Sequence, residues 1–202
     1  MRQLIKLKII LTLILNVGLS STKSQSLAFD RTVAIIQNGK TITPTTLYDT
    51  IKLNRDSFSI RFNCRKYDDK ANKFQAVQIA AVTEDSCLHF IRAGQQLNDI
   101  PFFQTGTGLA AEEFGYNNLF IDNEAHHYIT YTDDKDRRAI LILQNDQVLT
   151  LEWKLPMAFY KGEDVSFKNL PVNKIHLLLV NNDNLNTTID EGEYVVLTVI
   201  FD

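Results

Sequence analysis

Two adjacent histidines, His126 and His127, are the residues of this sequence best suited to proton transfer. They lie downstream of an acidic pair, Glu112 and Glu113. An imidazole that faces a carboxylate can act as a general acid or base. Neighbouring residues of a strand point to opposite faces, so the two rings cannot easily ligate one metal ion. The alternative is a polar strand entry with one half-buried and one exposed histidine.

The segment from Asn182 to Glu193 has the spacing of a calcium-binding loop. It is similar to loops of the EF-hand or dockerin type, which place oxygen ligands at fixed intervals around a hard cation. The would-be ligands are Asn182, Asn184, Asn186, Asp190 and Glu193. Only two of them are ionised, and Thr187 stands where such loops use glycine. The sequence therefore predicts weak calcium binding or, alternatively, an asparagine-rich hairpin loop.

The chain has two cysteines, Cys64 and Cys87. An even number of cysteines in an oxidising compartment can pair. A bridge between these two would close a loop of about two dozen residues and stabilise the fold by about 3 kcal/mol. We therefore expect a disulfide, with two buried thiols as the alternative.

Residues 87–125 lack the alternation of strands and are predicted to form an irregular insertion. Gly106 to Ala111 match the dinucleotide-binding fingerprint in form, but that motif requires a parallel βαβ unit, which the surroundings do not predict. Aromatic side chains beside permissive glycines are typical of recognition loops. We expect the segment 94–125 to bind a partner, or alternatively its aromatics to plug one end of the domain. The predicted binding residues are Phe103, Gly106, Gly108, Phe114 and Tyr116.

The first 26 residues have the order of a secretory signal peptide. Three basic residues precede a stretch, 9–15, that is apolar apart from Thr12, and small polar residues follow at 20–26. The apolar part is shorter than the roughly 20 residues that a membrane-spanning helix needs, which favours a signal peptide over the alternative, a membrane anchor. We expect a mature chain that begins near Leu27, has no transmembrane segment, and is secreted or resides in the periplasm or cell envelope.

The charge balance argues against a nucleic-acid partner. All four charged residues of the first 26 positions are basic. The rest of the chain therefore has 17 of the 21 lysines and arginines and all 24 acidic residues, which gives it a net charge of −7. Binding to a polyanion relies on clustered lysine and arginine. The basic residues of this chain are scattered.

The mature chain, 27–202, is predicted to be a single all-β domain, an antiparallel β-sandwich with jelly-roll or immunoglobulin-like topology. Apolar residues alternate with polar ones in several segments, namely 51–53, 58–64, 77–81, 149–155, 175–179 and 195–201. Asn38-Gly39 predicts a hairpin turn. We also expect hairpins that pair 58–64 with 77–81, and 128–132 with 139–143. His176 is expected on the outer face of its strand.

These features favour an exported, non-catalytic binding or assembly module with a protein or glycan partner. No cofactor is expected, apart from weakly bound calcium. The alternative is a glycan-directed or other hydrolase that uses Glu112 or Glu113 with His126 or His127. No G-x-S-x-G motif for nucleophilic catalysis is present.

Overall fold

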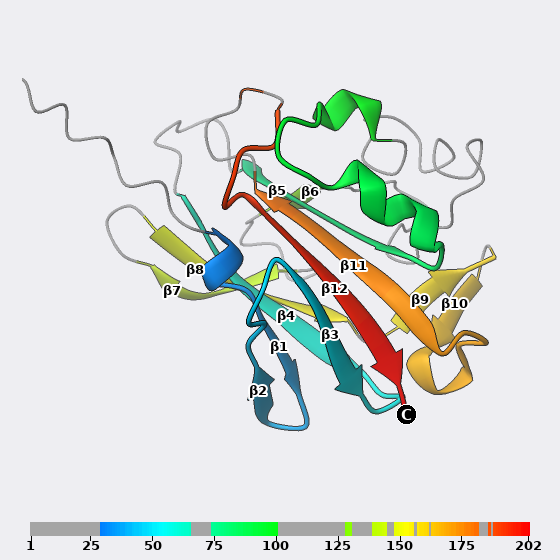
Figure 1. Cartoon of the computed structure of the whole chain (residues 1–202). Helices are drawn as coiled ribbons and strands as arrows, with labels where there is room; N and C mark the ends of the chain where they lie inside the picture. Colours follow the sequence, from blue (N-terminus) through cyan, green and yellow to red (C-terminus); the bar gives the residue numbers. More distant parts are fainter. Residues whose placement is uncertain are drawn as a thin grey trace, which may run out of the picture.

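Strands dominate the computed structural model of this protein, which describes residues 29–65, 74–100, 128–130, 139–144, 148–155, 157–161, 163–181, 186 and 188–202. Two five-stranded sheets make up most of it (Figure 1). Sheet A has the order β2-β1-β4-β8-β7, with β1 Ala34–Gln37, β2 Lys40–Ile42, β4 Phe58–Arg65, β7 Ala139–Gln144 and β8 Val148–Leu155. Sheet B has the order β3-β12-β11-β5-β6, with β3 Tyr48–Leu53, β5 Phe74–Val82, β6 Tyr128–Thr130, β11 Lys174–Asn181 and β12 Tyr194–Phe201. A separate hairpin pairs β9 Met157–Tyr160 with β10 Glu163–Ser166.

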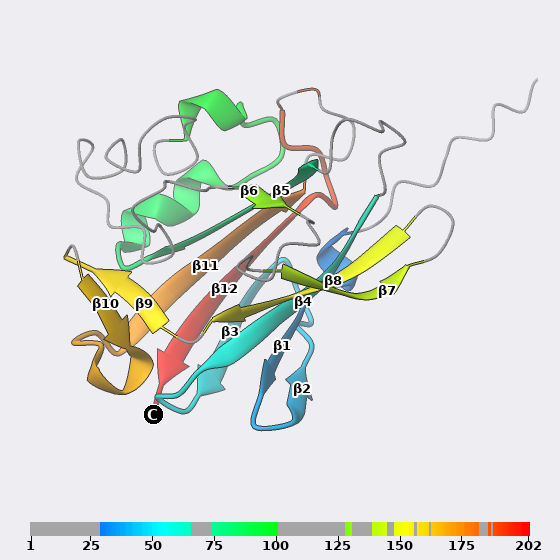
Figure 2. The same ribbon diagram turned by 180° about the vertical axis from the view of Figure 1, so that it is seen from behind.

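The predicted all-β fold is confirmed, and the main hydrophobic core lies between the two sheets. One apolar cluster combines the inward residues of β1, β4 and β8 with those of β3, β5, β11 and β12. Figures 1 and 2 show the two sheets from opposite sides. Along β4 the inward residues Phe58, Ile60 and Phe62 are buried and alternate with partly exposed polar residues. The alternation of apolar and polar residues in the sequence therefore reflects the two faces of each strand, one packed in the core and one nearer the solvent.

The hairpin predicted at Asn38-Gly39 is present between β1 and β2. Gln37 pairs with Lys40 across a two-residue turn. Asn38 has φ 51° and Gly39 has φ 73°. A two-residue turn with positive φ at both positions matches the twist of antiparallel strands, and asparagine followed by glycine favours it.

Two other predicted hairpins are wrong. β4 and β5 were expected to pair, but β4 belongs to sheet A and β5 to sheet B. The same applies to β6 in sheet B and β7 in sheet A. Alternation in the sequence shows that a strand has one buried face. It does not show whether the next strand pairs with it in the same sheet or packs against it from the facing sheet, because both arrangements bury the same face. The pairing of β3 with β12 is parallel, which a purely antiparallel sandwich does not include.

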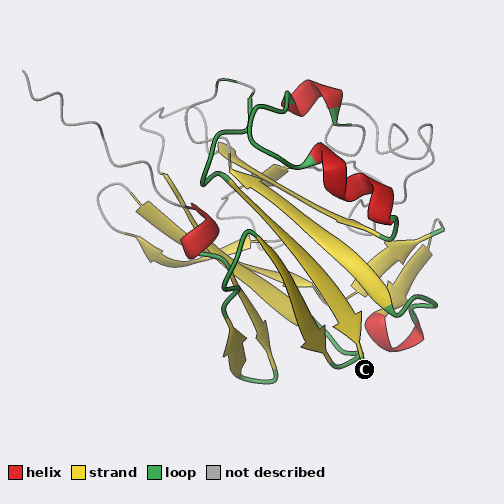
Figure 3. Ribbon diagram, in the orientation of Figure 1, coloured by secondary structure: helices red, strands yellow, loops and turns green. Residues whose placement is uncertain are grey.

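Short 3₁₀ helices cover the outer face of sheet B (Figure 3). η2 (Asp85–Phe90) and η3 (Leu97–Asp99) contribute Cys87 and Leu97 to a second apolar cluster. That cluster includes the outward residues Leu178 of β11 and Val196 of β12. Sheet B is therefore apolar on both faces, which explains the nearly continuous apolar run of β11.

Candidate functional site

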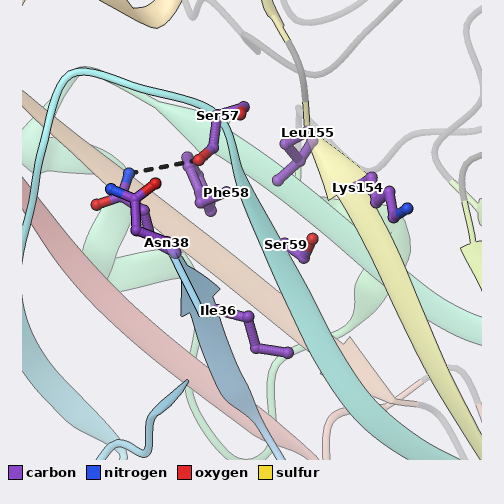
Figure 4. Close-up of a pocket in the computed structure, with 8 residues that line it drawn as sticks. Ile36, Asn38, Ser57, Phe58, Ser59, Lys154 and Leu155 are labelled. Atoms are coloured by element: carbon purple, nitrogen blue, oxygen red, sulfur yellow. Dashed lines mark hydrogen bonds between the residues drawn. The ribbon is translucent and has the colours of Figure 1, made fainter. Parts of the chain in front are cut away.

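A small groove opens at the end of sheet A where β1 ends, β4 begins and β8 ends (Figure 4). Its volume is about 280 Å³. The residues around it are Ile36, Gln37, Asn38, Ser57, Phe58, Ser59, Lys154 and Leu155. This volume lies just below the range of about 300–1,000 Å³ that is typical of ligand pockets, so the groove can hold only a small ligand or part of a larger one.

Gln37 fixes the wall of this groove. Its side chain is 7% exposed. Nε2 donates to the carbonyls of Asn54 at 3.0 Å and Asp56 at 3.2 Å, and Oε1 accepts the N–H of Asn54 at 2.9 Å. Asn54 directly follows edge strand β3. The side-chain amide of Gln37 donates to the carbonyl of Asn54 and accepts its N–H, as the backbone of a neighbouring strand would. The end of β1 in sheet A is thereby tied to the corner that leads from β3 into β4.

Polar side chains of three strands or turns meet at the groove. Figure 4 shows Ser57 and Ser59 in the middle, Asn38 on one side, and Lys154 on the other. Asn38, Ser59 and Lys154 have no side-chain hydrogen bond or ion pair within the described part of the chain. Their hydrogen-bonding groups are thus available to a ligand.

The floor of the groove is apolar and belongs to the core. Phe58 is 3% exposed and Leu155 is 4% exposed. Both are members of the cluster between the sheets. Little of their own surface is left for contact, but the partly exposed Ile36 adds apolar surface beside them, so a bound ligand would contact apolar atoms as well as the polar rim.

Polar pairs continue from the groove along the outer face of sheet A. Ser59 is opposite Lys154 in the register of β4 and β8, and Arg61 is opposite Glu152. Arg61 donates to Oε2 of Glu152 through Nη2 at 2.7 Å and Nε at 3.2 Å. Sequence reasoning missed this polar face, because only the β4–β8 register brings the pairs together.

His176 occupies the outer face of β11, as predicted, but it is 2% exposed because η2 covers it. Its Nε2 lies 2.7 Å from Oδ1 of Asp85, and its Nδ1 lies 3.0 Å from Oγ1 of Thr198. A carboxylate only accepts, so Nε2 donates to Asp85. Hydrogen bonds from Lys174 and His176 hold the pKa of the Asp85 carboxyl below its ordinary value of 3.8.

This Asp85–His176–Thr198 chain contains the residue types of a hydrolytic triad, but with exposure reversed. The Asp85 side chain is 68% exposed, whereas the imidazole is buried. In a hydrolase the imidazole must reach the nucleophile and the leaving group of the substrate. These hydrogen bonds instead attach the start of η2 to β11 and β12.

The expected disulfide between Cys64 and Cys87 is not formed, and this prediction is corrected. Cys87 is a free, buried thiol. It lies in η2, in the cluster on the outer face of sheet B, whereas Cys64 belongs to β4 of sheet A. Burial raises the pKa of the Cys87 thiol to about 12, and the charge of Glu84 adds to this rise.

The described part of the predicted calcium loop is held by internal hydrogen bonds. Oε2 of Glu193 accepts the N–H of Asp190 at 2.9 Å, and Glu193 is 4% exposed. Oδ2 of Asp190 accepts from Nδ2 of Asn186 at 3.0 Å. Asn182 and Asn184 lie outside the described residues. Calcium binding therefore stays a prediction, and the structure gives Glu193 a separate role in the turn 190–193.

Several predicted sites fall outside the described residues. They are the signal segment 1–26, the binding residues Phe103, Gly106, Gly108, Phe114 and Tyr116, and the acid–base candidates Glu112, Glu113, His126 and His127. Within the described residues, no three histidine, cysteine or acidic side chains are grouped to hold a metal ion. No helix in that part of the chain is long and apolar enough to cross a membrane.

Comparison of the chain with protein-family models, curated proteins and solved structures finds no match.

Proposed function

We propose that this protein is an exported, non-catalytic binding or assembly module that holds part of a glycan or protein in the groove of sheet A. One observation carries the proposal. The same groove is bordered by Asn38, Ser59 and Lys154, and none of their side chains forms a hydrogen bond or an ion pair within the described part of the chain. Ligand sites typically combine an apolar floor with a few convergent polar groups.

The composition of the groove favours binding over catalysis. Its described lining contains no histidine, cysteine or carboxylate. General acid–base or nucleophilic catalysis needs such a group within hydrogen-bond reach of the reacting atoms. The side chains that resemble a triad, those of Asp85, His176 and Thr198, instead attach η2 to β11 and β12.

Export rests on the predicted signal segment, and the state of Cys87 is compatible with it. A buried thiol with a raised pKa reacts slowly with oxidants, because the thiolate is the reactive form. Expression of the full chain in a bacterial host, followed by fractionation and N-terminal sequencing, tests export. We expect an exported product that begins near Leu27; an intact N-terminus in the cytoplasm would contradict export.

Binding is tested on printed arrays of defined glycans and peptides. We expect the full chain to retain at least one class of probe, and Ser59→Trp, which fills the groove, to lose it. Thr50→Trp on the exposed face of β3 is the matched control and should bind normally. Mass spectrometry of the retained probe should show no cleavage.

The predicted recognition segment 94–125 is the other candidate surface. Phe103→Ala and Tyr116→Ala complete the array experiment. Loss of binding in these two variants, with normal binding by Ser59→Trp, would assign recognition to that segment and overturn the groove as the site. Retention of no probe by the wild-type chain would also count against a glycan or peptide module.

A further inference from the structure

We infer that the groove selects a carboxylate-bearing sugar, and this inference rests on the proposed function of the groove as the ligand site. The carboxylate would contact the ammonium group of Lys154, and the ring hydroxyls would contact Asn38, Ser57 and Ser59. The argument starts from the charges that border the groove.

Lys154 gives the groove a positive charge in an otherwise acidic protein. It is exposed, forms no ion pair within the described part of the chain, and is the one ionisable residue among those that line the groove. Charge-assisted hydrogen bonds are about twice as strong as neutral ones. A carboxylate of the ligand would therefore gain more from this site than a hydroxyl in the same place.

The neighbouring acidic side chains are already occupied. Glu152 precedes Lys154 by two positions on the same face of β8, but Arg61 bonds its carboxylate at 2.7 Å. Asp56 accepts the N–H of Ser57 at 2.7 Å through Oδ1, and the Ser57 hydroxyl lies 3.5 Å from the same oxygen. Arg61 offsets the charge of Glu152, whereas Asp56 keeps its charge but is not among the residues that line the groove.

The neutral groups match a polyhydroxylated body. Ser57 and Ser59 each supply a hydroxyl, and Asn38 supplies an amide that both donates and accepts. Phe58 and Leu155 are almost completely buried, but Ile36 is partly exposed, so the carbon atoms of a ring would find some apolar contact beside these polar groups. The groove volume of about 280 Å³ restricts the bound part to roughly one ring.

NMR titration of the full-length mature chain with sodium glucuronate tests the inference, with glucose, acetate and triglycine as comparison ligands. We expect glucuronate to shift the amide signals of Asn38, Ser59 and Lys154. Glucose should bind about tenfold more weakly, since it lacks one charge-assisted hydrogen bond. Acetate and triglycine, which offer a carboxylate without a sugar ring, should also bind more weakly.

Lys154→Met should lower the affinity for glucuronate about tenfold and leave that for glucose unchanged. Lys52→Met, at an exposed lysine of β3 that is not among the groove-lining residues, is the matched control. Equal affinity for glucose and glucuronate, or an unchanged Lys154→Met, would overturn the carboxylate inference while the groove remains a sugar site. If no ligand shifts the groove signals at high millimolar concentration, the inference fails, and the array result for Ser59→Trp decides separately whether the groove binds another probe.

Discussion

Replacement of Gln37 by alanine tests whether the groove depends on the link between the two sheets. Gln37→Ala removes the hydrogen bonds to the N–H and carbonyl of Asn54 and to the carbonyl of Asp56. The contact to the Ser57 carbonyl, at 3.5 Å, is too long to count as a strong bond. The corner 54–57 would lose its attachment to β1.

The expected loss of stability follows from these three bonds. Each net hydrogen bond contributes about 0.5–1.5 kcal/mol. Asn54 and Asp56 are exposed, so water can replace part of what the side chain supplied. We therefore expect a decrease of about 2 kcal/mol in the free energy of unfolding, in the lower part of the range of about 1.5–4.5 kcal/mol that three such bonds give.

Urea denaturation measures this loss, with the slope of the transition as a check that both proteins unfold in the same way. Lys40→Ala is the control, because Lys40 is exposed in the neighbouring β2 and surface substitutions usually change stability by less than about 0.5 kcal/mol. Amide exchange at Asn54 should accelerate only in Gln37→Ala. If Gln37→Ala unfolds at the same urea concentration as Lys40→Ala, Gln37 does not hold the corner and our explanation of the groove wall is wrong.

Four further predictions concern other parts of the molecule. The pKa of Asp85 is lowered, so its contribution to stability is present above pH 3.8 and is lost as pH falls through its folded value. Asp85→Asn should flatten this acid limb of Tm against pH, and an unchanged limb would show that Asp85 does not help to attach η2. Cys87 should react with a thiol reagent only at the rate of unfolding, and rapid labelling of the folded chain would contradict its burial. Nδ2 of Asn181 is buried without a partner in the described structure, so Asn181→Leu should raise the free energy of unfolding by about 1 kcal/mol in urea, whereas a decrease would mean that the amide is satisfied. Calorimetry should give a calcium dissociation constant of about 10⁻⁴ to 10⁻³ M that Asp190→Asn weakens, and no heat at millimolar calcium would end the loop prediction.

Local sequence signals predicted the strands well. The alternation in 58–64, 149–155, 175–179 and 195–201 corresponds to β4, β8, β11 and β12. The hairpin at Asn38-Gly39 could be predicted because the positive φ values of its turn depend on the two turn residues themselves. These features depend on neighbours in the chain, which a single sequence contains.

The pairing of strands and the groove could not be predicted in the same way. β4 and β5 are consecutive strands in different sheets, and β3 pairs in parallel with the last strand. Likewise Ser59 and Lys154 meet only through the register of β4 with β8. Each residue alone is an ordinary polar position of a strand, so no local pattern marks a site.

The most direct measurement of the central claim, that the groove is the ligand site, is a crystal structure of the mature chain with a ligand that the arrays identify. We predict ligand density between Asn38, Ser59 and Lys154, within hydrogen-bond distance of at least two of them. Density over the segment 94–125, with the groove filled only by solvent, would contradict the claim.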